Sequence, residues 1–113
     1  MKRTFVYSEL FEYALRGRKK APEILEAIES EILKNPLCGD IVPGTGGVRK
    51  FRSEDFTRGK GKRGGFRVLY LDLPHVERTH LIFLYDKNKA DDLSSAGKKR
   101  INELVLEIKG EPT

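Results

Sequence analysis

The chain has 113 residues and a single cysteine, Cys38. This length provides one domain, residues 1–113, and one cysteine excludes an internal disulfide, which suits a reducing compartment. No apolar run is long enough for a membrane-spanning helix, and the first seven residues turn polar too soon for a secretory signal. We therefore expect a small cytoplasmic protein without a membrane partner.

The first third of the chain predicts one strand and two helices. The run 4–7 is β-branched and aromatic, which is typical of a strand. Ser8 is placed to cap a helix that ends near Gly17, and its apolar stripe comprises Leu10, Phe11, Ala14 and Leu15. Pro22 suits the first turn of a second helix, which Asn35-Pro36 ends.

The rest of the chain predicts three strands and a last helix. Glycines and prolines indicate an irregular loop over 40–47, and a short strand follows over 48–52. Two strong strands, 66–73 and 79–85, are joined by a turn over 74–78. The second is apolar on both faces, which predicts a central place in the sheet. The last helix has an apolar stripe at helical spacing, Ser94 or Ser95 as its cap and Gly110 as its end, the stripe being Ile101, Leu104, Val105 and Ile108.

The predicted order is therefore β-α-α-β-β-β-α. Because strands and helices are segregated after the opening unit, we expect an α+β fold with a twisted, mainly antiparallel sheet packed by helices.

The positive charge is concentrated in one segment. The net charge is +5, and residues 49–67 carry +6, from two acidic and eight basic residues: Arg49, Lys50, Arg52, Arg58, Lys60, Lys62, Arg63 and Arg67. A focused basic patch attracts a polyanion, and the usual polyanion is nucleic acid. A solvated loop that keeps the chain soluble is the simpler alternative.

Several catalytic classes lack their motif. His75, His80 and Cys38 have no spacing that makes a metal site, so we expect no metal and no cofactor. The glycine-rich run 59–62 does not match a phosphate-binding loop that leads from a strand into a helix.

Arg67 stands at the entrance of a hydrophobic strand, where a guanidinium needs an anionic partner. That partner is either a structural carboxylate, such as Asp72 or Asp86, or a phosphate. At the mouth of the strand, its side chain is not expected to fill the centre of the core. Arg49 and Arg52 can approach the same region from the preceding strand.

Two further residues reach Arg67 if the strong strands pair as a hairpin. The end of the second strand supplies Tyr85 and Lys87. Such a cluster can cleave RNA: the ribose 2′-hydroxyl attacks the phosphate, arginine stabilises the developing charge, and lysine or tyrosine moves protons.

Four segments together resemble the RelE/HigB-like toxins of bacterial type II toxin–antitoxin systems: Gly46-Gly47-Val48-Arg49-Lys50-Phe51-Arg52, Gly61 to Tyr70, Leu84-Tyr85-Asp86-Lys87-Asn88 and Asp92-Leu93-Ser94. The resemblance implies a RelE-like fold and a metal-independent messenger RNA endonuclease, an mRNA interferase that acts in the A site of translating ribosomes. It implies Arg67 as the strand arginine and Tyr85 or Lys87 as acid and base. Its basic groove corresponds to Arg49, Lys50, Arg52, Lys60, Lys62 and Arg63.

The resemblance also implies partners. They are the ribosome, mRNA and a cognate antitoxin, often a helix-turn-helix protein, through which alone the toxin reaches operator DNA. The alternative is a module, such as an inactive toxin homologue, that binds RNA or DNA without cleaving it.

Overall fold

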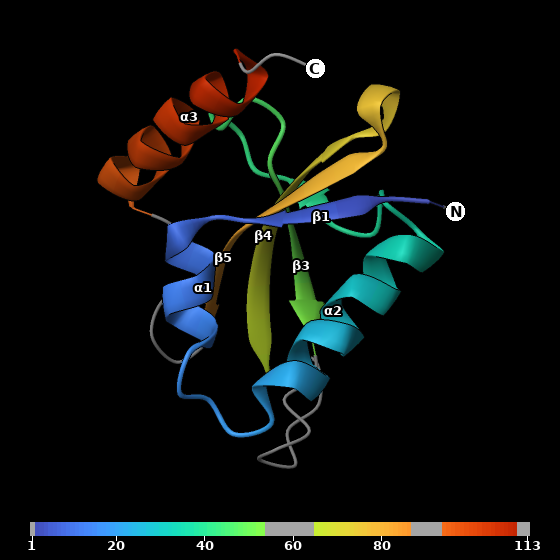
Figure 1. Cartoon of the computed structure of the whole chain (residues 1–113). Helices are drawn as coiled ribbons and strands as arrows, with labels where there is room; N and C mark the ends of the chain where they lie inside the picture. Colours follow the sequence, from blue (N-terminus) through green and yellow to red (C-terminus); the bar gives the residue numbers. More distant parts are fainter. Residues whose placement is uncertain (1, 54–64, 87–93, 111–113) are drawn as a thin grey trace.

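The computed structural model describes residues 2–53, 65–86 and 94–110 and shows an α+β fold, as the sequence predicts (Figure 1). The elements in chain order are strand β1 (Thr4–Tyr7), helices α1 (Glu9–Leu15) and α2 (Ala21–Lys34), strands β2 (Asp40–Ile41), β3 (Arg49–Ser53) and β4 (Phe66–Leu73), the 3₁₀-helix η2 (Pro74–Val76), strand β5 (Arg78–Asp86) and helix α3 (Ser95–Lys109).

The strands form one mixed sheet of five strands in the order β1-β5-β4-β3-β2. β1 runs parallel to β5, and the other neighbouring pairs are antiparallel. β5 is paired on both sides, as its two apolar faces predict. The short strand β2 falls in the segment expected to be an irregular loop. Gly39 lets this segment approach β3, since a Cβ there would lie 2.8 Å from the carbonyl oxygen of Lys50.

Helices cover both faces of the sheet. On one face, α1 and α2 pack their buried side chains against the sheet, these being Phe11, Ile24, Ile28 and Ile32. On the other face, α3 packs Ile101, Val105 and Ile108 against β4 and β5. Burying each large apolar side chain contributes about 1.5–3 kcal/mol, so one core holds α1 and α2 together and a second core holds α3.

Alternation along β4 divides its side chains between the two cores. Phe66, Val68 and Tyr70 belong to the core under α1 and α2, whereas Leu69 and Leu71 belong to the core under α3. The position of a residue along a strand therefore decides on which face of the sheet its side chain lies. We call these the α1/α2 face and the α3 face.

The expected caps hold the starts of two helices. The Ser8 Oγ accepts a hydrogen bond from the Phe11 amide at 3.0 Å and donates one to the Ile82 carbonyl at 2.6 Å. The Ser94 Oγ accepts from the Gly97 amide at 3.0 Å. Ser8 thus caps α1 and also attaches it to β5.

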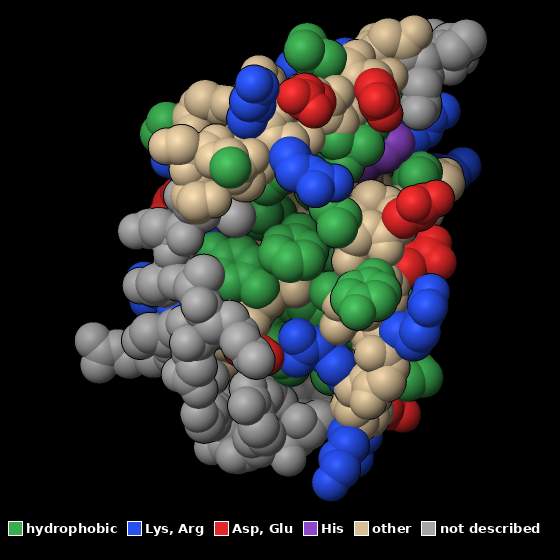
Figure 2. Space-filling view, turned by 90° about the vertical axis from the view of Figure 1, so that its left-hand side faces the viewer, with side chains coloured by type: hydrophobic (Ala, Val, Ile, Leu, Met, Phe, Trp, Pro, Cys, Tyr) green, Lys and Arg blue, Asp and Glu red, His purple; other side chains and the backbone are tan. Residues whose placement is uncertain are grey.

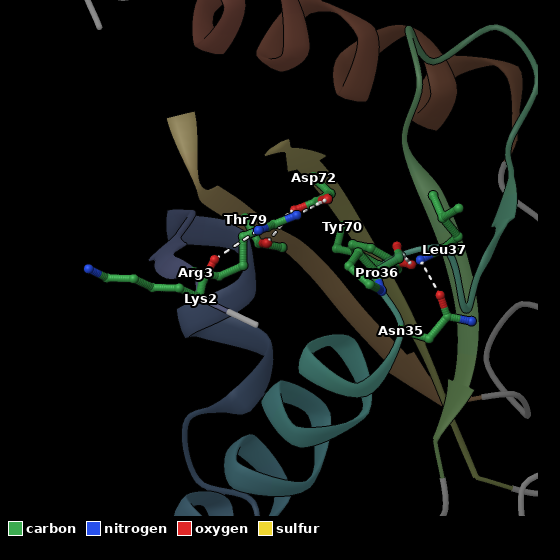
Figure 3. A network of polar contacts seen from close by, with 8 residues as sticks. All are labelled: Lys2, Arg3, Asn35, Pro36, Leu37, Tyr70, Asp72 and Thr79. Carbon is green, nitrogen blue, oxygen red and sulfur yellow. Dashed lines mark hydrogen bonds and ion pairs between the residues drawn. The ribbon is translucent and has the colours of Figure 1, made fainter. Parts of the chain in front are cut away.

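A polar network attaches the N-terminus to the middle of the sheet (Figure 3). The Arg3 guanidinium donates to both oxygens of Asp72, at 2.7 and 3.1 Å, and the Thr79 hydroxyl donates to the same carboxylate at 2.7 Å. The hydrogen bond to Asp72 raises the pKa of Arg3. Because Arg3 precedes β1, and Asp72 and Thr79 lie on β4 and β5, this network joins three strands.

Within residues 2–53, 65–86 and 94–110, no helix combines the length and the apolar character needed to cross a membrane.

Candidate nucleic-acid interface

Three candidate residues stand in one row across the sheet. Arg67 on β4 lies opposite Arg52 on β3, and on its other side it lies opposite Tyr85 on β5. Directly opposed residues in an antiparallel pair point to the same face, with Cβ atoms about 4.5–5.5 Å apart. The row Arg52–Arg67–Tyr85 therefore presents two guanidiniums and a phenol side by side on the α3 face.

Arg67 is the most buried member of the row. Its side chain is only 2% exposed, and its Nη1 lies 3.5 Å from the carbonyl oxygen of Phe66. The expectation that this side chain stays out of the protein interior is wrong. A guanidinium held this deeply is fixed in orientation, which favours bidentate contact with an anion and also makes its removal costly for the fold.

The two carboxylates considered as structural partners of Arg67 point to the opposite face. Asp72 follows the alternation of Phe66 and Tyr70 on β4, and it pairs with Arg3 at 2.7 Å. Asp86 lies opposite Phe66 and pairs with the Arg18 Nη1 at 3.1 Å. Both carboxylates are therefore engaged on the α1/α2 face of the sheet, away from the Arg67 guanidinium.

Tyr85 is held by aromatic stacking. Its ring lies 5.8 Å from that of Phe83, with the two planes at 27°. Tyr85 is 6% exposed, so its ring is fixed from several sides. A phenol placed in this way keeps its position relative to Arg67, as proton transfer to a reacting atom requires.

The basic residues of β3 divide between the two faces. Lys50 lies opposite Leu69 and so shares the α3 face with Arg52. Arg49 lies opposite Tyr70, and its Nη1 donates to the Gly39 carbonyl at 2.7 Å. The expectation that Arg49 and Arg52 converge on Arg67 therefore holds for Arg52 but is wrong for Arg49.

The remaining candidates lie outside the described residues. They are Lys60, Lys62, Arg63 and Lys87. Their roles stay predictions from the sequence.

The structure adds Arg18, which lies between the first two helices and which the sequence does not single out. Its guanidinium carbon lies 4.8 Å from the centre of the Phe66 ring, its Nε donates to the Ala14 carbonyl at 2.7 Å, and its Nη1 pairs with Asp86. Phe66 and Asp86 are the chain neighbours of Arg67 and Tyr85. Arg18 therefore contacts the first residue of β4 and the last residue of β5, on the face of the sheet opposite the row.

Neither histidine joins the row. His75 lies in η2, beyond the far end of β4, and His80 is buried on β5 opposite Leu71. In the part of the chain that the structure describes, no three His, Cys, Asp or Glu side chains are grouped so that they could hold a metal ion. A comparison with models of known protein families found none that matches the chain.

Proposed function

We propose that this protein is an mRNA endonuclease that acts on translating ribosomes, the toxin of a type II toxin–antitoxin pair. The observation that carries the proposal is the row Arg52–Arg67–Tyr85 on three adjacent strands. The α+β fold, the basic segment and the resemblance of the sequence to RelE/HigB-like toxins support it.

The electrostatics of the row favour a phosphate ligand. Arg52 and Arg67 place two guanidiniums directly opposite one another on neighbouring strands. A phosphate that contacts both guanidiniums accepts charge-assisted hydrogen bonds from each of them. The exposed Arg52 can reach the ligand first, and the buried Arg67 then offers a fixed site for one of its oxygens.

The row contains two of the groups that RNA cleavage needs, a cation for the phosphate and a proton donor. The ribose 2′-oxygen attacks the adjacent phosphorus and loses its proton, the bond from phosphorus to the 5′-oxygen breaks, and that oxygen takes up a proton. The products are a 2′,3′-cyclic phosphate and a 5′-hydroxyl. Arg67 stabilises the charge on the phosphoryl oxygens, and Tyr85 delivers the proton to the leaving oxygen. Lys87, outside the described residues, remains the candidate base.

The proposal includes the location and the partners that the toxin class implies. The protein acts in the cytoplasm, where translating ribosomes supply and orient the messenger. An antitoxin keeps it inactive, and operator DNA is reached only through the toxin–antitoxin complex.

The test is cleavage of a defined messenger in a reconstituted translation reaction, with cut sites mapped by primer extension. We expect cleavage only when ribosomes translate the message, with 5′-hydroxyl and cyclic-phosphate ends. The same RNA without ribosomes is the control. Binding to ribosomes without any cleavage would instead identify a non-catalytic RNA-binding module, and a metal-dependent cut would contradict the proposed chemistry.

A further inference from the structure

A groove runs between α1 and α3, and none of the residues of the basic row lines it. It consists of two adjoining cavities of about 520 and 440 Å³, which share Glu9, Leu10 and Arg100. Figure 2 shows the side of the molecule on which α1 and α3 lie, with hydrophobic side chains gathered in a hollow near its middle and charged side chains around them.

The lining of the groove includes accessible apolar side chains. Leu10 is 41% exposed and Tyr13 is 74% exposed, although Leu10 belongs to the apolar stripe that the sequence predicts for this helix. The two residues are three apart on α1 and so lie on one side of that helix. From the other wall, α3 contributes the half-buried Leu104. Neighbouring exposed apolar side chains with a charged border are typical of a protein-binding surface.

The border of the groove is acidic, in contrast to the rest of the protein. The cavities are lined by four carboxylates, Glu9, Glu12, Glu103 and Glu107, and by two guanidiniums, Arg16 and Arg100. The groove therefore carries −2, whereas the whole chain carries +5. RNA is repelled by such a surface, and a cationic partner is attracted to it.

The walls also indicate the conformation of the occupant. Arg100, Glu103, Leu104 and Glu107 follow the spacing i, i+3, i+4, i+7, so α3 presents one continuous stripe of side chains. Both walls are helices whose backbone groups are bonded internally, so they offer no edge for strand pairing. A helix satisfies its own backbone and needs only side-chain contacts.

We propose that the groove between α1 and α3 binds a basic amphipathic helix of a partner protein. Its apolar side chains, spaced i, i+3 or i+4, insert beside Leu10, Tyr13 and Leu104. Its lysines or arginines meet the four carboxylates at the border. α3 has 15 residues and is about 22 Å long, which provides contacts for about three turns of such a helix. The proposal is independent of whether the basic row binds RNA.

The test uses a displayed library of helix-forming peptides, about 16 residues long, with randomised surface positions, selected against the whole protein. We expect enriched peptides to combine an apolar stripe with a net positive charge. In titrations of the best peptide, Leu10→Ser and Tyr13→Ser should each weaken binding by roughly tenfold. Glu103→Gln combined with Glu107→Gln should weaken binding mainly at low salt.

The matched control is Leu106→Ser, because Leu106 is 64% exposed on α3 but lines neither cavity. It should leave peptide binding unchanged. The proposal is overturned if no peptide is enriched, if enriched peptides are acidic, if a short RNA displaces the peptide, or if Leu106→Ser weakens binding as much as Leu10→Ser. Self-association that Leu10→Ser abolishes would assign the groove to a second copy and overturn it too.

Discussion

Arg52 and Arg67 lie directly opposite each other on β3 and β4, so two guanidiniums share one face of the sheet at adjacent positions. Arg52 is exposed and Arg67 is buried, which gives them different contributions. In the proposed function, the exposed cation sets how strongly a phosphate is attracted, and the buried one sets how accurately the phosphate is held.

Arg67→Lys should reduce ribosome-dependent cleavage by about 10²–10³-fold while the protein stays folded. Lysine keeps the positive charge but loses the planar pair of donors that holds a phosphoryl oxygen. Cleavage rates and thermal unfolding on the same preparation check this. Arg67→Ala is a poorer test, because deleting a side chain that is only 2% exposed also destabilises the fold, by about 2–5 kcal/mol if it behaves like other buried truncations. A lysine variant that cleaves like the wild type would remove Arg67 from the mechanism.

Arg52→Gln and Arg49→Gln should affect RNA binding differently, although each removes one positive charge from β3. Arg52 shares the face of Arg67, whereas Arg49 bonds the Gly39 carbonyl on the other face. We expect only Arg52→Gln to reduce the slope of log affinity against log salt, by about 0.7 for single-stranded RNA. Equal slopes for the two variants would show that overall charge, and not the row, governs binding.

The sequence predicted the strands and the hairpin well because their patterns are local. Two apolar runs rich in β-branched and aromatic residues, 66–73 and 79–85, with a turn that begins at Pro74 between them, predict the hairpin that brings Tyr85 opposite Arg67. The cap Ser8 was also predicted, and Ser94 is one of the two caps that the sequence offers for the last helix, since a cap depends on residues three positions away.

The features that the sequence missed depend on contacts between distant segments. Residues 40–41 carry no strand pattern, and they pair with β3 only because Gly39 allows the backbones to approach. Arg18 contacts Asp86 across 68 positions of sequence. The period of two along β3 could have placed Arg49 and Arg52 on opposite faces, but grouping the residues by charge alone concealed this.

Tyr70→Phe should lower the free energy of unfolding by about 1–3 kcal/mol. The Tyr70 hydroxyl donates to the Pro36 carbonyl at 2.7 Å and accepts from the Gly39 amide at 3.1 Å, so removing it leaves two backbone groups without this partner. Burial raises the pKa of this phenol, as expected for a group that stays neutral inside the protein. Denaturant unfolding of the variant measures the loss. Tyr13→Phe, at an exposed tyrosine, is the control and should change nothing.

Tyr7 should ionise well above the ordinary pKa of a tyrosine. Burial, together with the hydrogen bond that its hydroxyl donates to Glu29, raises the pKa of Tyr7 from 10.0 to about 12. A raised phenol pKa means that the folded state favours the neutral form, so its contribution to stability is complete below about pH 10 and is lost as the pH rises through 12. Subtracting the tyrosinate absorbance titration of Tyr7→Phe from that of the wild type isolates this group. Glu29→Gln should bring the pKa of Tyr7 back toward 10, and a Tyr7 that already titrates there would contradict the assignment.

Arg18→Met should lower the free energy of unfolding modestly. It should lower the cleavage rate by more than this loss of stability explains. The ion pair with Asp86 is partly exposed and contributes about 0.2–1 kcal/mol, and the contact with the Phe66 ring adds about 0.5–2 kcal/mol. A loss of this size leaves nearly all molecules folded well below the melting temperature. If Arg18 were purely structural, its replacement would therefore leave the cleavage rate per molecule unchanged at these temperatures. We expect that rate to fall at least about tenfold with an unchanged KM for ribosomes, because Phe66 and Asp86 set the positions of Arg67 and Tyr85. Arg18→Lys, which keeps the charge but not the planar contact with the ring, should lie between the wild type and Arg18→Met. An unchanged rate in both variants would limit Arg18 to holding the fold.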